Sequence, residues 1–267
     1  MPVNRQSTTL PVYFGVPGKQ LFGCYHEPQS TTIRSTAVVI CQPMGHEYIY
    51  CHRALRQLAT KLCEVGFPVL RFDFYGCGDS AGDGDEGTVT QWLEDVSVAA
   101  AEVKSRAGVA QICLIGLRLG GALAFMAAAQ RDDIAGLVLW DPVVLGTAYL
   151  SELLQLQSEA LKQRRKSNRN TAVAEIVGFG LPGGLREEVE RLDLYSVSPN
   201  VHARMLTLHT NDTVDCVLAR HLIAHAAKVE DQHIPAPKIW QPTVDGNLLV
   251  PNQPLRSIVA WTSGAHS

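Results

Sequence analysis

The sequence has little that suits nucleic acid, anionic membranes or an oxidising compartment. Only 18% of its 267 residues are charged, and 23 basic against 26 acidic side chains give a formal net charge of -3. Without a basic excess or a polybasic block, phosphate backbones and anionic lipid surfaces are poor partners. The seven cysteines are an odd number and scatter through apolar stretches as well as loops, which favours reduced thiols. The composition therefore predicts a globular, cytoplasmic protein.

Long apolar segments are also scarce. The first ten residues show no apolar core of a secretory signal. Residues 107–130 are long enough to span a bilayer, but Arg118 lies at their centre, at a cost of roughly 2.5–3.5 kcal/mol, and glycines interrupt them. This stretch is better explained as a strand, a sharp turn and a helix, so we expect no membrane insertion.

From residue 35 onward, short β-branched runs alternate with segments of helical periodicity. This alternation indicates a mostly parallel sheet flanked by helices. We expect strands at residues 37–41, 68–72, 111–115, 136–140, 205–209 and near 233–240. Helices are expected at residues 50–65, 89–105, 119–130, 215–229 and 254–262. Residues 10–25 should form a hairpin that turns at Pro17-Gly18 and joins the edge of the sheet.

A long insertion, residues 145–195, separates the fourth of these strands from the fifth. It begins with an amphipathic helix carrying Leu150, Leu153 and Leu154, and it ends with a second helix near residues 185–192. Such insertions usually cover a site, so we expect a helical cap over the carboxyl ends of the strands, with these leucines facing inward. The basic run at residues 162–170 should be its most mobile part. The predicted core comprises residues 1–144 and 196–267.

Residues 111–130 read QICLIGLRLGGALAFMAAAQ, an apolar strand followed by a glycine-flanked turn and a helix. This is the setting of a nucleophile elbow, Gly-x-Ser-x-Gly, in which the central serine attacks the substrate. Arg118 occupies the central position. A guanidinium stays protonated in proteins and is not a nucleophile, so a covalent acyl-enzyme at residue 118 is excluded.

Four segments together resemble the α/β-hydrolase superfamily. They are QPMGHEY at residues 42–48, LRFDFYGCGDS at residues 70–80, GLRLG at residues 116–120 and LWDPV at residues 139–143. Within that superfamily the chain is similar to the serine-aminopeptidase-like group and, more narrowly, to the second hydrolase associated with exosortase A systems. The resemblance covers almost the whole chain. It implies a three-layer α/β-hydrolase fold with a helical cap, and an exopolysaccharide context.

The resemblance also implies a degenerate catalytic triad. In the order Ser, acid, His, the acid follows the strand after the cap, and Asp212 matches that place. The base should lie at residues 241–252, but QPTVDGNLLVPN contains no histidine. The N–H groups of Leu119 and of Met44 or Gly45 resemble an oxyanion hole. With Arg118 added, the mouth of the sheet is expected to bind an anion.

Two hypotheses describe the role of Arg118. It could form a structural ion pair with Asp141 or Asp212, both expected near the elbow, or it could hold a carboxylate or phosphate of a ligand. His46 could be a general base near the oxyanion loop, although a loop residue anchoring Glu47 or Arg53 is the favoured reading. A nucleophilic cysteine is disfavoured because the sequence shows no partner base for Cys41, Cys51 or Cys77.

No metal or cofactor is predicted. The acidic residues at 79–86 match no EF-hand loop. His221 and His225 stand four apart on a predicted helix, but the glutamate of a zinc-protease motif is missing, so a solvated helix face is favoured. Residues 178–183 fit a dinucleotide motif only as a string, because no strand precedes them and Pro182 interrupts them.

Three functions follow for testing. The first is a cap-covered pocket that binds a small acyl or carboxylate metabolite through Arg118 and the oxyanion-loop amides, and that transforms it, if at all, without an acyl-enzyme. The second is a catalytically silent pseudo-hydrolase acting as a partner or scaffold in a biosynthetic or exopolysaccharide pathway. The third, ester or thioester hydrolysis, follows from the fold alone. A pocket of a few hundred Å³ favours the first, whereas Arg118 locked to carboxylates favours the second.

Overall fold

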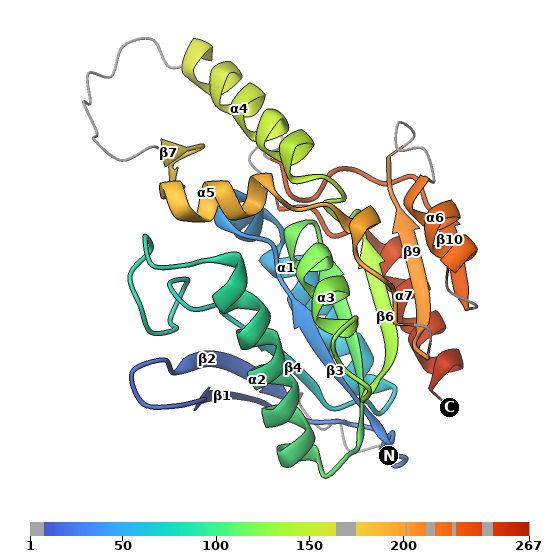
Figure 1. Ribbon diagram of the computed structural model, residues 1–267. Coiled ribbons are helices and arrows are strands. Elements are labelled where there is room, and N and C mark those ends of the chain that lie inside the picture. The colour runs from blue at the N-terminus through green and yellow to red at the C-terminus, as the bar shows by residue number, and fades with distance from the viewer. Residues whose placement is uncertain are drawn as a thin grey trace.

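The computed structural model describes residues 8–163, 175–200, 202–211, 217–225, 228–241 and 248–266. Within these residues the chain forms an eight-stranded sheet in the order β1-β2-β4-β3-β5-β6-β9-β10, with helices on both faces (Figure 1). The predicted architecture of a mostly parallel sheet flanked by helices is confirmed.

One edge of the sheet is antiparallel and the rest is parallel. The hairpin of β1 (Thr9–Phe14) and β2 (Leu21–His26) was predicted, and β2 pairs antiparallel with β4 (Val69–Phe72). The parallel strands that continue from β4 are β3 (Thr36–Cys41), β5 (Gln111–Leu117), β6 (Ile134–Trp140), β9 (Arg204–His209) and β10 (Val229–His233). The central strands are covered on both faces, which explains their continuous apolar runs.

Two apolar layers hold the helices to the sheet. α1 (Gly45–Glu64) and α7 (Asn252–Ala265) cover one face, whereas α2 (Val89–Ala107) and α3 (Leu119–Ala128) cover the other together with α6 (Val217–His225). α2 shows clear end signals. The Thr88 side chain accepts a hydrogen bond from the Gln91 N–H, and Gly108 ends the helix in the left-handed conformation at φ 66°.

Three predicted boundaries are wrong. α1 begins at Gly45 rather than at residue 50, which brings Glu47 into the first turn, where the helix dipole favours an acidic side chain. The described part of α6 is Val217–His225, and Val229, where the helix was expected to end, already belongs to β10. The last strand is therefore residues 229–233 and not 233–240. The chain stays beside β9 for a few more residues, because the Ile234 and Ala236 N–H groups donate to the carbonyls of His209 and Thr210, but the fixed φ of Pro235 and Pro237 departs from regular strand geometry.

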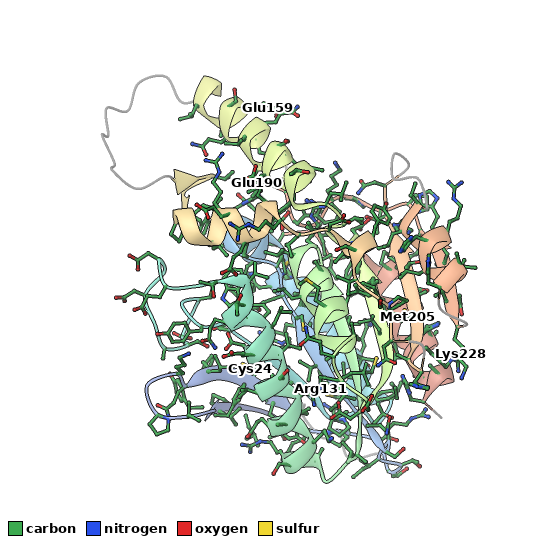
Figure 2. All side chains as sticks on the ribbon, in the orientation of Figure 1. Cys24, Arg131, Glu159, Glu190, Met205 and Lys228 are labelled. Atoms are coloured by element: carbon green, nitrogen blue, oxygen red, sulfur yellow. The ribbon has the colours of Figure 1, made fainter. Side chains whose placement is uncertain are left out.

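The described residues of 145–195, which we call the cap, lie above the carboxyl ends of the parallel strands (Figure 1). They contain α4 (Gly146–Gln163), β7 (Glu175–Ile176), β8 (Phe179–Gly180), α5 (Gly183–Glu190) and the short 3-10 helix η1 (Leu194–Ser196). Figure 2 shows Glu159 and Glu190 on this part of the molecule, away from Met205 and Lys228 at the amino ends of β9 and β10.

The inner face of α4 differs from the prediction at one leucine. Leu150 and Leu153 are buried as expected, but Leu154 is 46% exposed. One residue turns about 100° around a helix, so Leu153 and Leu154 cannot both point straight at the core. Most of the run at residues 162–170 lies outside the described residues. Across the described ranges, no helix combines the length and apolar character needed to span a membrane.

Candidate functional site

The turn between β5 and α3 has the geometry of an elbow, with Arg118 at its tip. Arg118 adopts φ 55° and ψ -123°, a conformation that is strained for a residue with a side chain. Its N–H donates to the Trp140 carbonyl at 3.1 Å, and its carbonyl accepts from the Val143 N–H at 3.1 Å. A Cβ on Gly120 would collide with the Cys41 carbonyl oxygen, so glycine lets α3 pack tightly beneath the elbow.

The Arg118 side chain lies in a buried group of charged and aromatic residues. Its Nε donates to Glu47 Oε1 at 2.9 Å and its Nη2 donates to Glu152 Oε2 at 2.5 Å. The Tyr149 hydroxyl donates to Glu47 Oε2 at 2.9 Å. The guanidinium carbon is 4.7 Å from the ring centre of Trp240 and 5.4 Å from that of Tyr149. We call these five residues the Arg118 cluster.

The cluster joins four parts of the chain, and Trp240 comes from the segment after β10. Arg118 comes from the elbow, Glu47 from the first turn of α1, and Tyr149 and Glu152 from α4 of the cap. Residues three apart lie on the same side of a helix, so Tyr149 and Glu152 both reach down toward the elbow. Gln241 Nε2 also donates to Glu152 Oε1, at 3.3 Å. The Arg118–Glu152 ion pair and the Tyr149–Glu47 hydrogen bond thus fasten the cap to the core.

Burial and charge act in opposite directions within this cluster. Burial alone lowers the pKa of Arg118, but the charges of Glu47 and Glu152 outweigh it and the net pKa is raised. Burial raises the pKa of Glu47, and Arg118 offsets this only in part. Burial and the Glu47 charge raise the pKa of Tyr149. Arg118 therefore stays a cation, whereas Glu47 is a carboxyl that holds its proton to higher pH than usual.

The expected partners of Arg118 are replaced by others. The Asp141 carboxylate accepts from Thr210 instead, at 3.0 Å from the backbone N–H and 2.6 Å from Oγ1. Asp212 lies outside the described residues. A structural ion pair is present, as one of the two readings predicted, but its carboxylates belong to Glu47 and Glu152.

A cavity of about 250 Å³ lies beside the cluster. Met44, Gly45 and His46 of the predicted oxyanion loop form one wall, and Tyr149 is shared with the cluster. Leu119, the other predicted oxyanion donor, is buried at the start of α3. The oxyanion loop therefore borders a space that can hold a small molecule.

His46 is buried at this wall. Burial and the neighbouring Arg118 charge lower its pKa to about 4, so the imidazole is neutral at neutral pH. Its Nε2 has no hydrogen-bond partner among the residues that the structure describes. Glu47, one of its expected partners, bonds to Arg118 and Tyr149.

Asp73 shapes another wall of the cavity, and sequence reasoning did not single it out. Its Oδ1 accepts from Gln42 Nε2 at 2.8 Å and from the Tyr48 hydroxyl at 3.3 Å, and its Oδ2 accepts from the Asp79 N–H at 3.1 Å. Tyr48 and Gly78 line the cavity. Asp73 thus ties the oxyanion loop to the loop after β4. The position of Asp73 in the LRFDFYGCGDS segment, which resembles the superfamily, could have identified it as a candidate site residue.

The three cysteines considered as nucleophiles have raised pKa values. Burial raises the pKa of Cys41 to about 12 and that of Cys51 well above its ordinary value. Burial, with Asp73 and Asp95 nearby, raises the pKa of Cys77 to about 12. The thiolate form is scarce at neutral pH in each case, which supports the view that none is the nucleophile.

His221 and His225 lie on one face of α6, with ring centres 4.4 Å apart. His225 Nδ1 is 2.8 Å from the His221 carbonyl oxygen and the Tyr195 ring packs edge-on against His221. The pair is thus explained by contacts within the helix and with η1.

Comparison with known proteins places the chain in a family. The family model described as serine aminopeptidase, S33, matches residues 35–228, more than half of the chain. Among solved structures, Est1E from Butyrivibrio proteoclasticus with ferulic acid bound is 18% identical, covers 95% of this chain and 96% of its own, and has a TM-score of 0.66. The proline iminopeptidase of Mycobacterium smegmatis is 13% identical, covers 96% and 98%, and has a TM-score of 0.66.

A hypothetical protein from Pseudomonas aeruginosa is 15% identical, covers 100% of this chain and 96% of its own, and has a TM-score of 0.68. Identities this low show the fold and nothing finer. No curated protein matches the sequence significantly. The chain has the α/β-hydrolase fold and belongs to the serine aminopeptidase S33 family.

Proposed function

We propose that this protein is a non-hydrolytic member of its family that binds a small molecule in the cavity beneath the cap. The observation that carries the proposal is the state of Arg118. The residue at the tip of the elbow is 8% exposed and bonds to two glutamates, and it has no nucleophilic atom. Residues 241–252 also supply no histidine to act as the base.

The cavity supports a ligand-binding role, but Arg118 is not available to bind the ligand as expected. Arg118 was expected to hold a ligand carboxylate. Its Nε and Nη2 donate to Glu47 and Glu152, so a ligand carboxylate would have to displace one of these two glutamates. The predicted acyl group therefore fits the site better than the predicted free carboxylate.

A second candidate is the silent partner or scaffold in a biosynthetic or exopolysaccharide pathway. The locked Arg118 supports it, because a residue fixed between two carboxylates fastens the cap without chemistry. The cavity separates the two candidates, since a scaffold needs no internal binding site. The cysteine usage of the sequence supports a cytoplasmic location for either role.

Labelling with a fluorophosphonate probe tests the absence of hydrolysis. We expect no stoichiometric label on any serine and no burst with activated esters, in the parent protein and in Arg118→Ser, which still lacks the base. An active serine hydrolase carried through the same assay is the positive control. A stoichiometric serine label on the parent would overturn the proposal.

A further inference from the structure

We propose that Arg71 and Arg56 form a second binding site, which takes a small phosphate-type oxyanion between α1 and the strands β2 and β4. Neither arginine lines the cavity beneath the cap. The site is therefore independent of the proposed function, and each can be tested without the other.

Arg71 is a partly buried cation whose partner is not an acid. It lies on β4, directly opposite Cys24 of the antiparallel strand β2. Its Nε donates to Nε2 of His26 at 3.1 Å. Among the residues that the structure describes, no carboxylate forms an ion pair with Arg71. Charged side chains that leave water are normally paired or bind a ligand, so Arg71 is a candidate anion-binding residue.

His26 orients the guanidinium of Arg71 without neutralising it. The imidazole is 1% exposed, and Thr9 Oγ1 lies 3.2 Å from its Nδ1. Burial, followed by the charges of Arg71 and Arg56, lowers the pKa of His26 to about 4, so the ring is neutral at neutral pH. Arg71 is thus held from behind by a neutral acceptor and keeps its full positive charge.

The Nη1 and Nη2 groups of Arg71 are available to a ligand. Neither makes a hydrogen bond to a described residue, and neither is among the polar atoms that are buried without a partner, so both reach solvent. The two groups lie side by side on a planar guanidinium. This arrangement can donate two parallel hydrogen bonds to one oxyanion.

Arg56 adds a second cation from α1. Residues four apart lie on one side of a helix, so Tyr48, His52 and Arg56 form a stripe along α1. Burial lowers the pKa of Arg71 and the Arg56 charge lowers it further, which places the two guanidinium groups near each other. Arg56 is exposed and, like Arg71, forms no ion pair with a described residue.

The charges at this site favour a dianion. Asp73 lies nearby, but its carboxylate accepts from Gln42, Tyr48 and the Asp79 N–H. A doubly charged oxyanion would offset the repulsion between the two arginines, whereas a monocarboxylate carries half of that charge. Binding to an anionic membrane takes a cluster of about 4–8 basic residues, so two arginines suit a small soluble phosphate instead.

Titration with inorganic phosphate tests the site. At constant ionic strength, NMR spectra of the isotope-labelled protein should show saturable shifts of the Nε–H signals of Arg71 and Arg56. Acetate should bind about tenfold more weakly, because it has a single charge. A parallel titration with glycerol phosphate distinguishes a phosphorylated metabolite from the free ion, since the source that fits the site should bind more tightly.

Three arginine variants make the test specific. Arg71→Gln removes the charge but keeps a side-chain donor beside His26, and it should weaken phosphate binding about tenfold or more. Arg56→Gln changes an exposed residue and should weaken binding about threefold. Arg186→Gln makes the same change of charge at an exposed position of α5 and should leave binding unchanged.

Melting temperatures separate binding from a merely structural role. Arg71 has no carboxylate partner to lose among the described residues, so Arg71→Gln without phosphate should melt at the temperature of the parent or higher. Phosphate should raise the melting temperature of the parent but not that of Arg71→Gln. If Arg71→Gln fails to fold, the comparison of Arg56→Gln with Arg186→Gln decides.

Three results would overturn the proposal. The first is the absence of saturable shifts in the parent protein. The second is equal weakening by Arg56→Gln and Arg186→Gln, which would mean that phosphate responds to net charge and not to a site. The third is binding to vesicles of phosphatidylcholine and phosphatidic acid without binding of free phosphate or glycerol phosphate, which would assign the two arginines to a lipid surface.

Discussion

Arg118 Nη2 lies 2.5 Å from Glu152 Oε2, so the residue at the tip of the elbow is bonded directly to the cap helix α4. The same guanidinium reaches Glu47 at the start of α1 through its Nε. The position that holds the nucleophile in a Gly-x-Ser-x-Gly elbow here connects three elements of the fold. Stability and cap closure should therefore respond to changes at this one residue.

Replacing Arg118 with methionine should destabilise the fold. The change leaves Glu47 without its cation at a fully buried site, and breaking one partner of a buried pair costs about 3–5 kcal/mol. Urea denaturation followed by circular dichroism measures the loss. A variant as stable as the parent that loses ligand binding would show that Arg118 serves the ligand and not the fold.

Two controls accompany this change. Removing both buried partners in Arg118→Met with Glu47→Met should recover part of the stability, because the charge left without its partner, that of Glu152, is partly exposed, whereas the buried Tyr149 hydroxyl loses its acceptor. Glu152→Gln should cost about 0–1 kcal/mol, because that side chain is 31% exposed and its ion pair is partly screened. If Glu152→Gln lowered the free energy of unfolding as much as Arg118→Met, the Arg118–Glu152 pair would not be the more exposed and weaker of the two ion pairs.

Glu47 should make stability fall as the pH rises. Burial raises its folded-state pKa above the ordinary value of 4.5, so above about pH 4.5 the unfolded chain loses this proton before the folded protein does. The free energy of unfolding of the parent minus that of Glu47→Gln should thus decrease from pH 4.5 upward. Denaturation curves at several pH values measure it. A difference that grows with pH would mean that Arg118 outweighs the burial of the carboxyl.

Much of the fold was predictable because it depends on local patterns. β3 and β5 are apolar runs because the sheet is covered on both faces, and Gly116, Gly120 and Gly121 mark the turn that packs closely against its neighbours. β10 gave no such signal. It lies at the edge of the sheet, its residues are mostly exposed, and its sequence VEDQH is polar.

The site was less predictable because its contacts are long in sequence. Arg118 meets Glu47 across 71 positions and Glu152 across 34, and no spacing rule links them. The order of the strands correctly predicted that Asp141 lies near the elbow, but it could not show that the Asp141 carboxylate accepts its hydrogen bonds from Thr210 instead of Arg118. The elbow shape was encoded by nearby glycines, whereas the choice of carboxylates depended on how α1 and α4 pack.

Gly120→Ala should disrupt the elbow. A Cβ there would overlap the backbone carbonyl oxygens of Cys41 and Gln42, and backbone atoms cannot move aside as a side chain can. We expect a loss of about 3 kcal/mol or more in the free energy of unfolding, at the upper end for a single substitution. Gly184→Ala is the matched control, since its Cβ meets nothing within 4 Å in α5 and should be neutral or stabilising. Equal effects of the two changes would exclude tight packing as the reason for Gly120.

His46 should make the protein lose stability in mild acid. Its folded-state pKa is lowered from 6.5 to about 4, chiefly by burial and then by the Arg118 charge. Between pH 6.5 and 4 the unfolded chain binds a proton at this residue and the folded protein does not, so stability falls as the pH falls through this window. His46→Gln removes the difference and should reduce the slope by up to about 1.4 kcal/mol per pH unit. Parallel stability curves for parent and variant between pH 4 and 6.5 would show that the imidazole takes up its proton in the folded state.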